Sequence, residues 1–189
     1  MIWKCAMSLD GKNHQAGGRG QWLSGGESRA DVQRLRGEVD AILTSGETVR
    51  RDKPALTIRL PELLEGREQP WRVVVTDQPE TMPLDAPLFS DEWKGRTLLR
   101  GRADMEGTLR GLVREQGVLS VMIEAGGKFS AAMIAAGLVD EAVIYHAPII
   151  CGDTVPALLG VESPQSLALT GISRERLGRD LKVRGLIVK

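Results

Sequence analysis

Residues 118–147 read VLSVMIEAGGKFSAAMIAAGLVDEAVIYHA, and this stretch decides the fold class. Its hydrophobic pattern predicts four successive pieces: a strand, a glycine turn, a helix and a second strand, over residues 118–124, 125–128, 129–136 and 141–147. Gly137 follows the expected helix at the position where glycine commonly ends one. Strand–helix–strand units build parallel sheets, so the stretch indicates an α/β protein.

Glu124 ends the first of these strands, and Gly126 and Gly127 follow it. In open α/β sheets, ligands bind at the carboxyl ends of the strands. Paired glycines let backbone N–H groups approach a phosphate closely. We therefore expect an anionic ligand at this turn.

The remaining strands and helices are expected to complete a mixed, mostly parallel central sheet flanked by helices. Further strands are predicted over residues 1–7, 40–44, 71–76 and 97–99. One helix should follow Ser24, which has a capping-box spacing to Glu27, and another should span residues 105–116. The inward-facing residues of the latter are expected to be Leu109, Leu112 and Val113. The chain should close with an antiparallel pair over residues 167–173 and 181–188, and the whole of 1–189 is expected to be a single domain.

The composition excludes several classes of protein. The chain has 189 residues, with 25 basic and 25 acidic side chains, so no global field attracts nucleic acid or anionic lipid. No apolar run is long enough to span a membrane, and residues 1–4 do not open a signal peptide. Two cysteines and two histidines provide neither a disulfide framework nor metal-ligand spacing. We expect a cytoplasmic protein without a metal.

Several polar side chains could meet a phosphate. Arg29, Arg34 and Arg36 surround the apolar face of the helix after Ser24, where they could be solvated surface or phosphate ligands. Spacing does not choose between these readings. The hydroxyl-bearing sequence from Ser45 follows a buried strand and could also face a cofactor phosphate. Spacing alone thus predicts an α/β protein with a phosphate-binding cleft.

Seven segments together resemble one family, the reductase domain of bacterial riboflavin biosynthesis. This is the carboxyl-terminal half of the bifunctional RibD deaminase/reductase, which has a dihydrofolate-reductase-like fold. The segments occur in family order and span nearly the whole chain. They are KCAMSLDGK (4–12), WLSG (22–25), DVQRLR (31–36), DAILTSGETV (40–49), DKPALTIR (52–59), IEAGG (123–127) and AGLVDE (136–141).

The resemblance implies an NADPH-dependent reductase. In such an enzyme, hydride reaches C1′ of the ribosyl group of 5-amino-6-(5-phosphoribosylamino)uracil, or its diamino-pyrimidinone counterpart, and yields the ribitylamino form. The nicotinamide cofactor supplies the hydride, and the protein places it against the carbon. The family is commonly dimeric, which implies a homodimer.

Site residues follow from the same resemblance, position by position. The expected cofactor contacts are Ala6, Trp22, Thr48 and Asp52, with Gly126, Gly127, Lys128 and Phe129 opening the segment that wraps the pyrophosphate. The expected substrate contacts are Arg36, Leu56, Arg59 and Glu124. The residues expected at the reacting carbon are Lys4, Asp52 and Glu124.

The roles within this set stay partly open. Lys4 could donate a proton or stabilise a developing oxyanion. Asp52 or Glu124 could hold Lys4 or hydrogen-bond the ribose hydroxyls. Arginine side chains suit a 5′-phosphate, because guanidinium binds its oxygens in bidentate fashion.

Two positions differ from the usual family pattern, and two other functions are compatible with the sequence. Gly20 stands where a serine is frequent, and Lys53 stands where the family often has a second aspartate. The alternatives are a reductase of a dihydropterin or related heterocycle on the same fold, and a non-catalytic nucleotide-binding module.

Overall fold

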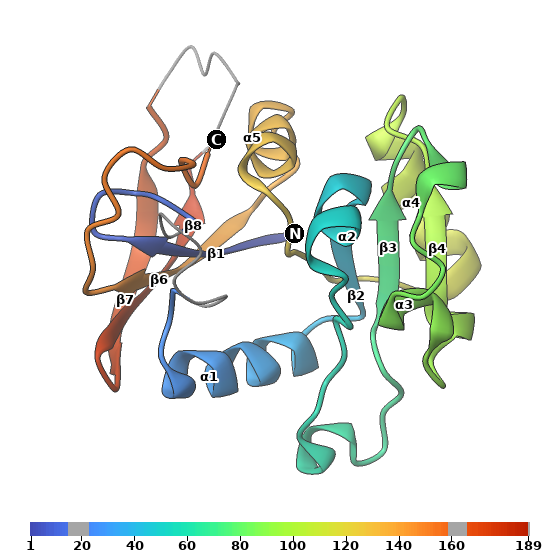
Figure 1. Ribbon diagram of the computed structural model, residues 1–189, viewed down its shortest axis with the longest axis horizontal. Helices are drawn as coiled ribbons and strands as arrows, with labels where there is room; N and C mark the ends of the chain where they lie inside the picture. Colours follow the sequence, from blue (N-terminus) through green and yellow to red (C-terminus); the bar gives the residue numbers. More distant parts are fainter. Residues whose placement is uncertain (15–22, 159–165, 189) are drawn as a thin grey trace. The chain divides into compact units, whose positions relative to one another are not determined.

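The structure is a computed structural model that describes residues 1–14, 23–158 and 166–188 (Figure 1). The chain forms two compact units. Unit 1 comprises Met1–Val32 and Gly127–Lys189, and unit 2 comprises Gln33–Gly126. Each unit is described by itself. The expectation of a single domain stays a prediction.

Unit 2 contains a four-stranded parallel sheet. Its strands, in spatial order, are β4 (Thr97–Arg100), β3 (Trp71–Val75), β2 (Ala41–Ser45) and β5 (Val121–Ile123). Leu43 of β2 lies opposite Val73 of β3 on one side and Ile123 of β5 on the other. All three side chains are fully buried, as expected for parallel strands that are covered on both faces.

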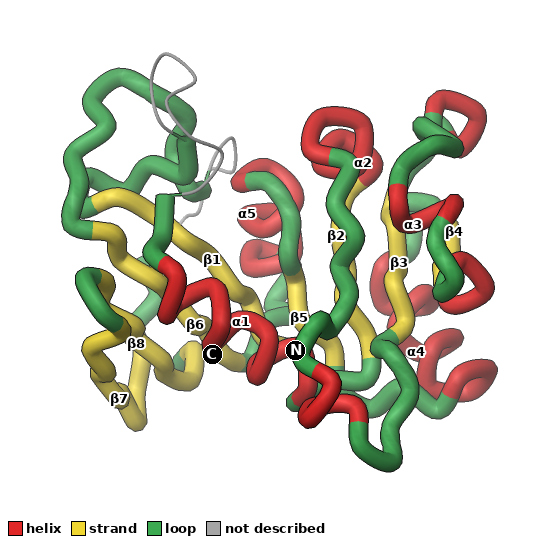
Figure 2. Tube along the Cα trace, turned by 60° about the horizontal axis from the view of Figure 1, so that its bottom comes forward, coloured by secondary structure: helices red, strands yellow, loops and turns green. Residues whose placement is uncertain are grey.

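The helices of unit 2 are α2 (Gly46–Asp52), α3 (Pro87–Ser90) and α4 (Met105–Gln116), with short 3₁₀ turns at Pro61–Leu64, Pro79–Thr81 and Lys94–Arg96. Helix α2 begins where β2 ends (Figure 2). The predicted bounds of α4 are confirmed, but its predicted inward face is partly wrong. Leu112 is fully buried, whereas Val113 is 47% exposed. Met105, seven residues before Leu112, lies on the same buried face of the helix. Val113 follows Leu112 directly and is therefore rotated about 100° around the helix axis from Leu112.

Unit 1 contains β1 (Ile2–Ser8), β6 (Glu141–Ala147), β8 (Asp180–Ile187) and β7 (Leu169–Leu177), paired in that order. β1 and β6 are parallel, and β8 is antiparallel to both β6 and β7. The expected carboxyl-terminal antiparallel pair is therefore confirmed. Helix α5 (Gly127–Ala135) also belongs to unit 1, while α1 (Gly26–Gly37) begins in unit 1 and ends in unit 2.

The strand–helix–strand stretch over residues 118–147 differs in detail from its prediction. β5 is shorter than expected, and α5 begins two residues earlier, at Gly127. β5 pairs with β2, and β6 pairs with β1. Local periodicity predicts the strands but does not encode these pairings, which join segments far apart in the sequence.

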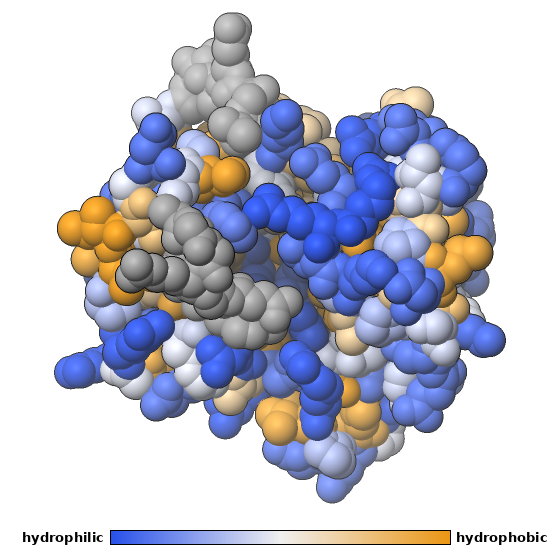
Figure 3. Space-filling model, in the orientation of Figure 1, coloured by the Kyte–Doolittle hydropathy of each residue, from blue (hydrophilic) through white to orange (hydrophobic). Residues whose placement is uncertain are grey.

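Unit 1 buries a tyrosine whose hydroxyl has a partner, and the surface of the unit carries some apolar side chains. The hydroxyl of the fully buried Tyr145 donates to Asp31 at 2.7 Å, and Lys182 pairs with the same carboxylate at 2.6 Å. Leu9 and Ile150 are exposed by 63% and 78%. Apolar side chains gather at the left edge of the view in Figure 3, while most of that face is hydrophilic. Over the described residues, no helix has the length and apolar character needed to cross a membrane.

Candidate functional site

The carboxyl ends of β2 and β5 bring together the hydroxyl and glycine groups of the site. Ser45 is extended at φ −96° and caps α2, because its Oγ accepts from the Thr48 backbone N–H at 3.2 Å. The two hydroxyls of Ser45 and Thr48 lie 2.9 Å apart. Gly126 N–H then donates to Thr48 Oγ1 at 3.1 Å. Parallel pairing of β2 with β5 explains this meeting, because it places both strand ends at one edge.

Gly46 makes the tight entry into α2 possible. A Cβ on this residue would lie 2.7 Å from Thr76 Cβ, closer than a real carbon contact allows. By contrast, a Cβ on the exposed Gly126 would meet only Thr48 Oγ1, at 3.8 Å. The surface at Gly126 within unit 2 is therefore open, as a backbone that receives a phosphate must be.

Arg36 and Glu124 form a bidentate ion pair in unit 2. Arg36 Nε donates to Glu124 Oε1 at 2.7 Å, and its NH2 nitrogen donates to Oε2 at 3.2 Å. Both side chains are about nine-tenths buried. The remaining nitrogen, NH1, donates to the Thr57 carbonyl at 2.7 Å. All three guanidinium nitrogens of Arg36 are thus engaged within the protein.

The end of α2 and the segment that follows it carry three further predicted site residues. Asp52 is the last residue of α2 and is exposed, with a 3.9 Å contact to Arg51. Leu56 is buried and has a φ of 52°, in the left-handed region that leucine rarely adopts. The Arg59 side chain is exposed. The segment therefore presents one carboxylate and one guanidinium to solvent around a buried leucine.

Lys53, which departs from the family pattern, ends α2. Its φ of 42° is left-handed, and its N–H donates to the Val49 carbonyl at 3.0 Å. Its ammonium group pairs with Asp85 on the surface of unit 2. Gly20, the other departure, lies outside the described residues, as does the predicted cofactor contact Trp22.

Unit 1 contains the other predicted site residues. Lys4 and Ala6 are half-buried and alternate along β1 with the buried Trp3 and Cys5, so Lys4 and Ala6 share one face of the strand. Burial raises the pKa of the Cys5 thiol to about 12, so this thiol stays protonated at neutral pH.

Gly127 has a packing reason to be glycine. A Cβ on it would lie 2.8 Å from the Ala157 carbonyl oxygen and 3.0 Å from that of Pro156. Gly127 begins α5, followed by the exposed Lys128 and the half-buried Phe129. The first N–H groups of a helix have no partner within it, so the start of α5 suits an anionic group.

Three side chains outside the predicted set contact the segment that carries Leu56 and Arg59. They are Gln33, Gln69 and Arg72. The sequence contained a signal for Arg72, because a charged residue in a valine-rich strand that is expected to be buried needs a partner. The two glutamines had none.

The comparisons with known proteins agree on one family. The RibD C-terminal domain model matches residues 1–183. The chain is 34% identical over 193 residues to riboflavin biosynthesis protein RibD of Escherichia coli (strain K12), covering 87% of this chain and 52% of that protein. It is 36% identical over 184 residues to the RibD protein of Mycobacterium tuberculosis (strain ATCC 25618 / H37Rv), covering 96% and 52%. The chain spans about half the length of these relatives.

Solved structures support the same assignment. Acinetobacter baumannii RibD, form 1, superposes with a TM-score of 0.86 at 27% identity, covering all of this chain and 58% of that one. The Saccharomyces cerevisiae riboflavin biosynthesis reductase Rib7 has a TM-score of 0.74 at 17% identity, covering 99% and 89%, and shows the fold alone. The predicted dihydrofolate-reductase-like α/β fold is confirmed. This chain belongs to the RibD C-terminal domain family.

Proposed function

We propose that the chain is the NADPH-dependent reductase of riboflavin biosynthesis. It would reduce the ribosyl group of 5-amino-6-(5-phosphoribosylamino)uracil, or its diamino-pyrimidinone counterpart, to the ribitylamino form. The observation that carries the proposal is the family match over residues 1–183, which includes every predicted site residue of both units.

The geometry of unit 2 supports a nucleotide-binding role. Thr48 contacts Gly126 at an open carboxyl edge of the parallel sheet. Asp52 is exposed nearby in sequence, at the end of the helix whose first turn contains Thr48. Hydroxyls, an unobstructed glycine backbone and a carboxylate fit the phosphates and ribose hydroxyls of a nicotinamide nucleotide.

When bound, NADPH supplies the hydride. Thr48 and Asp52 would contact this cofactor, with Ala6 and Trp22 as further contacts. The backbone of Gly126 and Gly127, continued by Lys128 and Phe129, would receive the pyrophosphate.

The substrate would be held mainly by unit 2. The exposed Arg59 suits a 5′-phosphate, because its guanidinium is accessible to solvent and can bind phosphate oxygens in bidentate fashion. Glu124 would hydrogen-bond a ribose hydroxyl while Arg36 holds its carboxylate in place. Leu56 would contact the pyrimidine.

Lys4 would act at the reacting carbon. An ammonium group can donate a proton to the ring oxygen that is released, or stabilise the negative charge that develops there. Asp52 and Glu124 would orient the ribose hydroxyls. We further propose a cytoplasmic homodimer whose partners are small molecules and include neither nucleic acid nor membrane.

The test is an NADPH-oxidation assay with the phosphoribosylaminopyrimidine and with dihydropterins as separate substrates. Turnover of the pyrimidine with none of the pterins supports the proposal. Turnover of pterins alone would move the chain to the alternative reductase class. NADPH binding without turnover of either would make it a non-catalytic nucleotide-binding module.

Two variants test the assigned roles. Arg59→Ala removes a charge-assisted phosphate contact, so KM for the pyrimidine should rise by about 10- to 100-fold with little change in kcat. Lys4→Ala should lower kcat by about 100-fold or more, with a smaller effect on KM. A kcat for Lys4→Ala close to that of the wild type contradicts the role of Lys4.

A further inference from the structure

Residues 55–59 of unit 2 are held in place by side chains and not by a backbone ladder. The structure assigns them to neither helix nor strand. Their backbone groups instead bond to four side chains from outside the segment. These bonds join Ala55 to Arg72, Thr57 to Arg36, Ile58 to Gln69 and Arg59 to Gln33.

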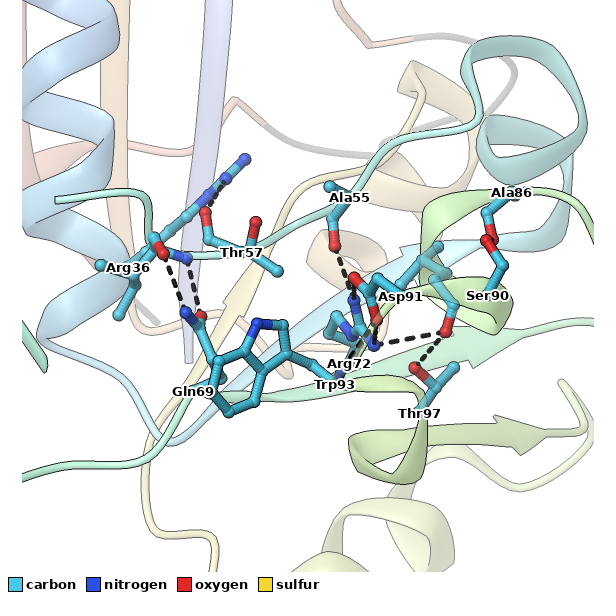
Figure 4. Close-up of polar contacts among 12 residues, drawn as sticks. Arg36, Ala55, Thr57, Gln69, Arg72, Ala86, Ser90, Asp91, Trp93 and Thr97 are labelled. Carbon is cyan, nitrogen blue, oxygen red and sulfur yellow. Dashed lines mark hydrogen bonds and ion pairs between the residues drawn. The ribbon is translucent and has the colours of Figure 1, made fainter. Parts of the chain in front are cut away.

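Gln69 forms the most complete of these contacts. Its Oε1 accepts from the Ile58 N–H at 2.8 Å, and its Nε2 donates to the Ile58 carbonyl at 2.8 Å. The amide therefore satisfies both backbone groups of one residue, as a neighbouring strand would (Figure 4). Gln69 is only 3% exposed, so water does not replace these bonds easily if the side chain is removed.

Arg72 anchors the start of the segment. It is fully buried and forms a bidentate pair with Asp91, at 2.6 and 2.9 Å. The nitrogen that makes the shorter of these bonds also donates to the Ala55 carbonyl at 3.1 Å (Figure 4). Asp91 in turn accepts from the Trp93 N–H at 3.0 Å. Contacts outside the segment thus hold the guanidinium in the position from which it donates to Ala55.

The segment needs this external support because its own conformation is unfavourable. Leu56, between the anchors at Ala55 and Thr57, has a left-handed φ of 52°. Left-handed backbone is disfavoured for residues with a Cβ. Ile58, the residue that Gln69 holds, directly precedes Arg59. The anchors therefore set where the Leu56 and Arg59 side chains point.

We propose that Gln69 is a positioning residue for substrate binding, acting through the backbone of Ile58 on Leu56 and Arg59. The proposal rests on the proposed function, in which these two residues contact the pyrimidine and its 5′-phosphate. Gln69 itself, being buried, would touch neither the pyrimidine nor the phosphate. Its loss should weaken substrate binding and leave the chemical step intact.

The test compares Gln69→Met with Gln116→Met. Methionine is nearly as long as glutamine but cannot replace either hydrogen bond. Gln116 is a half-buried glutamine at the end of α4, and its Oε1 has no hydrogen-bond partner among the described residues. Gln69→Met should raise KM for the pyrimidine about tenfold, with kcat within about twofold of wild type, because two neutral hydrogen bonds are lost. Gln116→Met should leave both constants unchanged.

Amide hydrogen exchange measures the positioning directly. Exchange at Ile58 and Arg59 should accelerate about tenfold in Gln69→Met and stay at the wild-type rate in Gln116→Met. If Gln69→Met does not fold, Gln33→Met serves instead, because it removes only the 2.8 Å bond to the Arg59 N–H. That variant should raise KM and accelerate exchange at Arg59, by smaller factors.

The outcomes separate this proposal from the proposed function. If the wild-type protein does not turn over the pyrimidine, the proposed function is refuted. The exchange rates at Ile58 and Arg59 still test whether Gln69 positions the segment. Unchanged KM in an active Gln69→Met protein overturns the inference, as does unchanged exchange. A fall in kcat as large as the rise in KM also overturns it, because it indicates general damage.

Discussion

Two extended regions of the molecule are held by opposite means. The β7–β8 hairpin of unit 1 is held by its own backbone, in an antiparallel register from Leu169–Ile187 to Leu177–Asp180. Most β7 side chains are exposed. Residues 55–59 of unit 2 have no ladder, and side chains from Gln33, Arg36, Gln69 and Arg72 bond their backbone.

The difference teaches where each region is sensitive to substitution. A backbone ladder tolerates almost any exposed side chain but not a change of backbone conformation. A segment held by buried side chains tolerates its own exposed residues but not the loss of an anchor. Residues that carry chemistry can thus vary on such a segment while distant anchors fix its shape.

The largest expected effect is the loss of the Arg72 anchor. Arg72→Met leaves Asp91, whose side chain is 22% exposed, without its cation, and leaves the Ala55 carbonyl without its donor. Removing one partner of a buried ion pair costs about 3–5 kcal/mol. Urea unfolding should show that the free energy of unfolding falls by that amount.

The matched control for this variant is Arg110→Met. Arg110 pairs with Glu106 one helical turn away, and both side chains are about two-thirds exposed. An exposed pair of this kind contributes about 0.3–0.5 kcal/mol. Equal losses for the two arginines would contradict the distinction between buried anchors and surface pairs.

The β7–β8 hairpin should be most sensitive to a substitution that changes the backbone conformation of its turn. Gly178 turns between β7 and β8 with a φ of 58°, and a Cβ there would lie 2.5 Å from the Glu27 side-chain carbon Cδ. Gly178→Ala should lower the free energy of unfolding by about 1–2 kcal/mol, the cost of left-handed backbone for a residue with a Cβ. Gly178→Asn should lose less, because asparagine adopts this conformation more readily. An alanine variant as stable as the wild type would show that the turn relaxes freely.

Much of the fold was predictable because it depends on local periodicity. The helix over 105–116 and the closing antiparallel strands follow from patterns within a dozen residues. The pairing of β5 with β2 does not, because strand order depends on contacts across 80 residues of chain. Val113 was misplaced because its neighbour Leu112 satisfies the same local pattern.

The candidate site was predictable only through the resemblance. Ser45 and Thr48 could be suspected from a strand followed by hydroxyls, and Gly126 from a glycine pair after a strand. The pairing of Arg36 with Glu124 joins residues 88 positions apart and leaves no local trace. The same holds for Gln69, since a buried glutamine that bonds a backbone looks like any surface glutamine in the sequence.

A third region extends the comparison to pH. In unit 1, Asp10 accepts from the Ser8 hydroxyl at 2.6 Å and from the N–H groups of Cys151 and Gly152 at 2.9 and 2.8 Å. The hydrogen bond from Ser8 and those from Cys151 and Gly152 lower the pKa of Asp10 from 3.8 to about 2. Because the folded pKa is the lower one, the carboxylate stabilises the fold above pH 3.8, and this contribution disappears as the pH falls to about 2.

Asp10→Asn measures this contribution. At pH 6 the variant should unfold at a lower urea concentration than the wild type. Its loss of unfolding free energy should be smaller than that of Gly178→Ala, because Asp10 is exposed. The gap between the two proteins should close as the pH falls through the range from 3.8 to about 2. A gap that stays constant down to pH 2 would contradict the hydrogen-bonded carboxylate as its source.

The smallest effect should come from a side chain on the ladder itself. Arg174 lies opposite Val183 in the register of the hairpin, and its side chain is exposed. Arg174→Ala keeps every backbone bond of β7, so the free energy of unfolding should change by less than about 0.5 kcal/mol. Urea unfolding of Arg174→Ala and Gly178→Ala compares the effect of a side chain with that of a backbone change in the same hairpin. If the arginine mattered as much as the glycine, β7 would depend on its side chains, as residues 55–59 depend on their anchors.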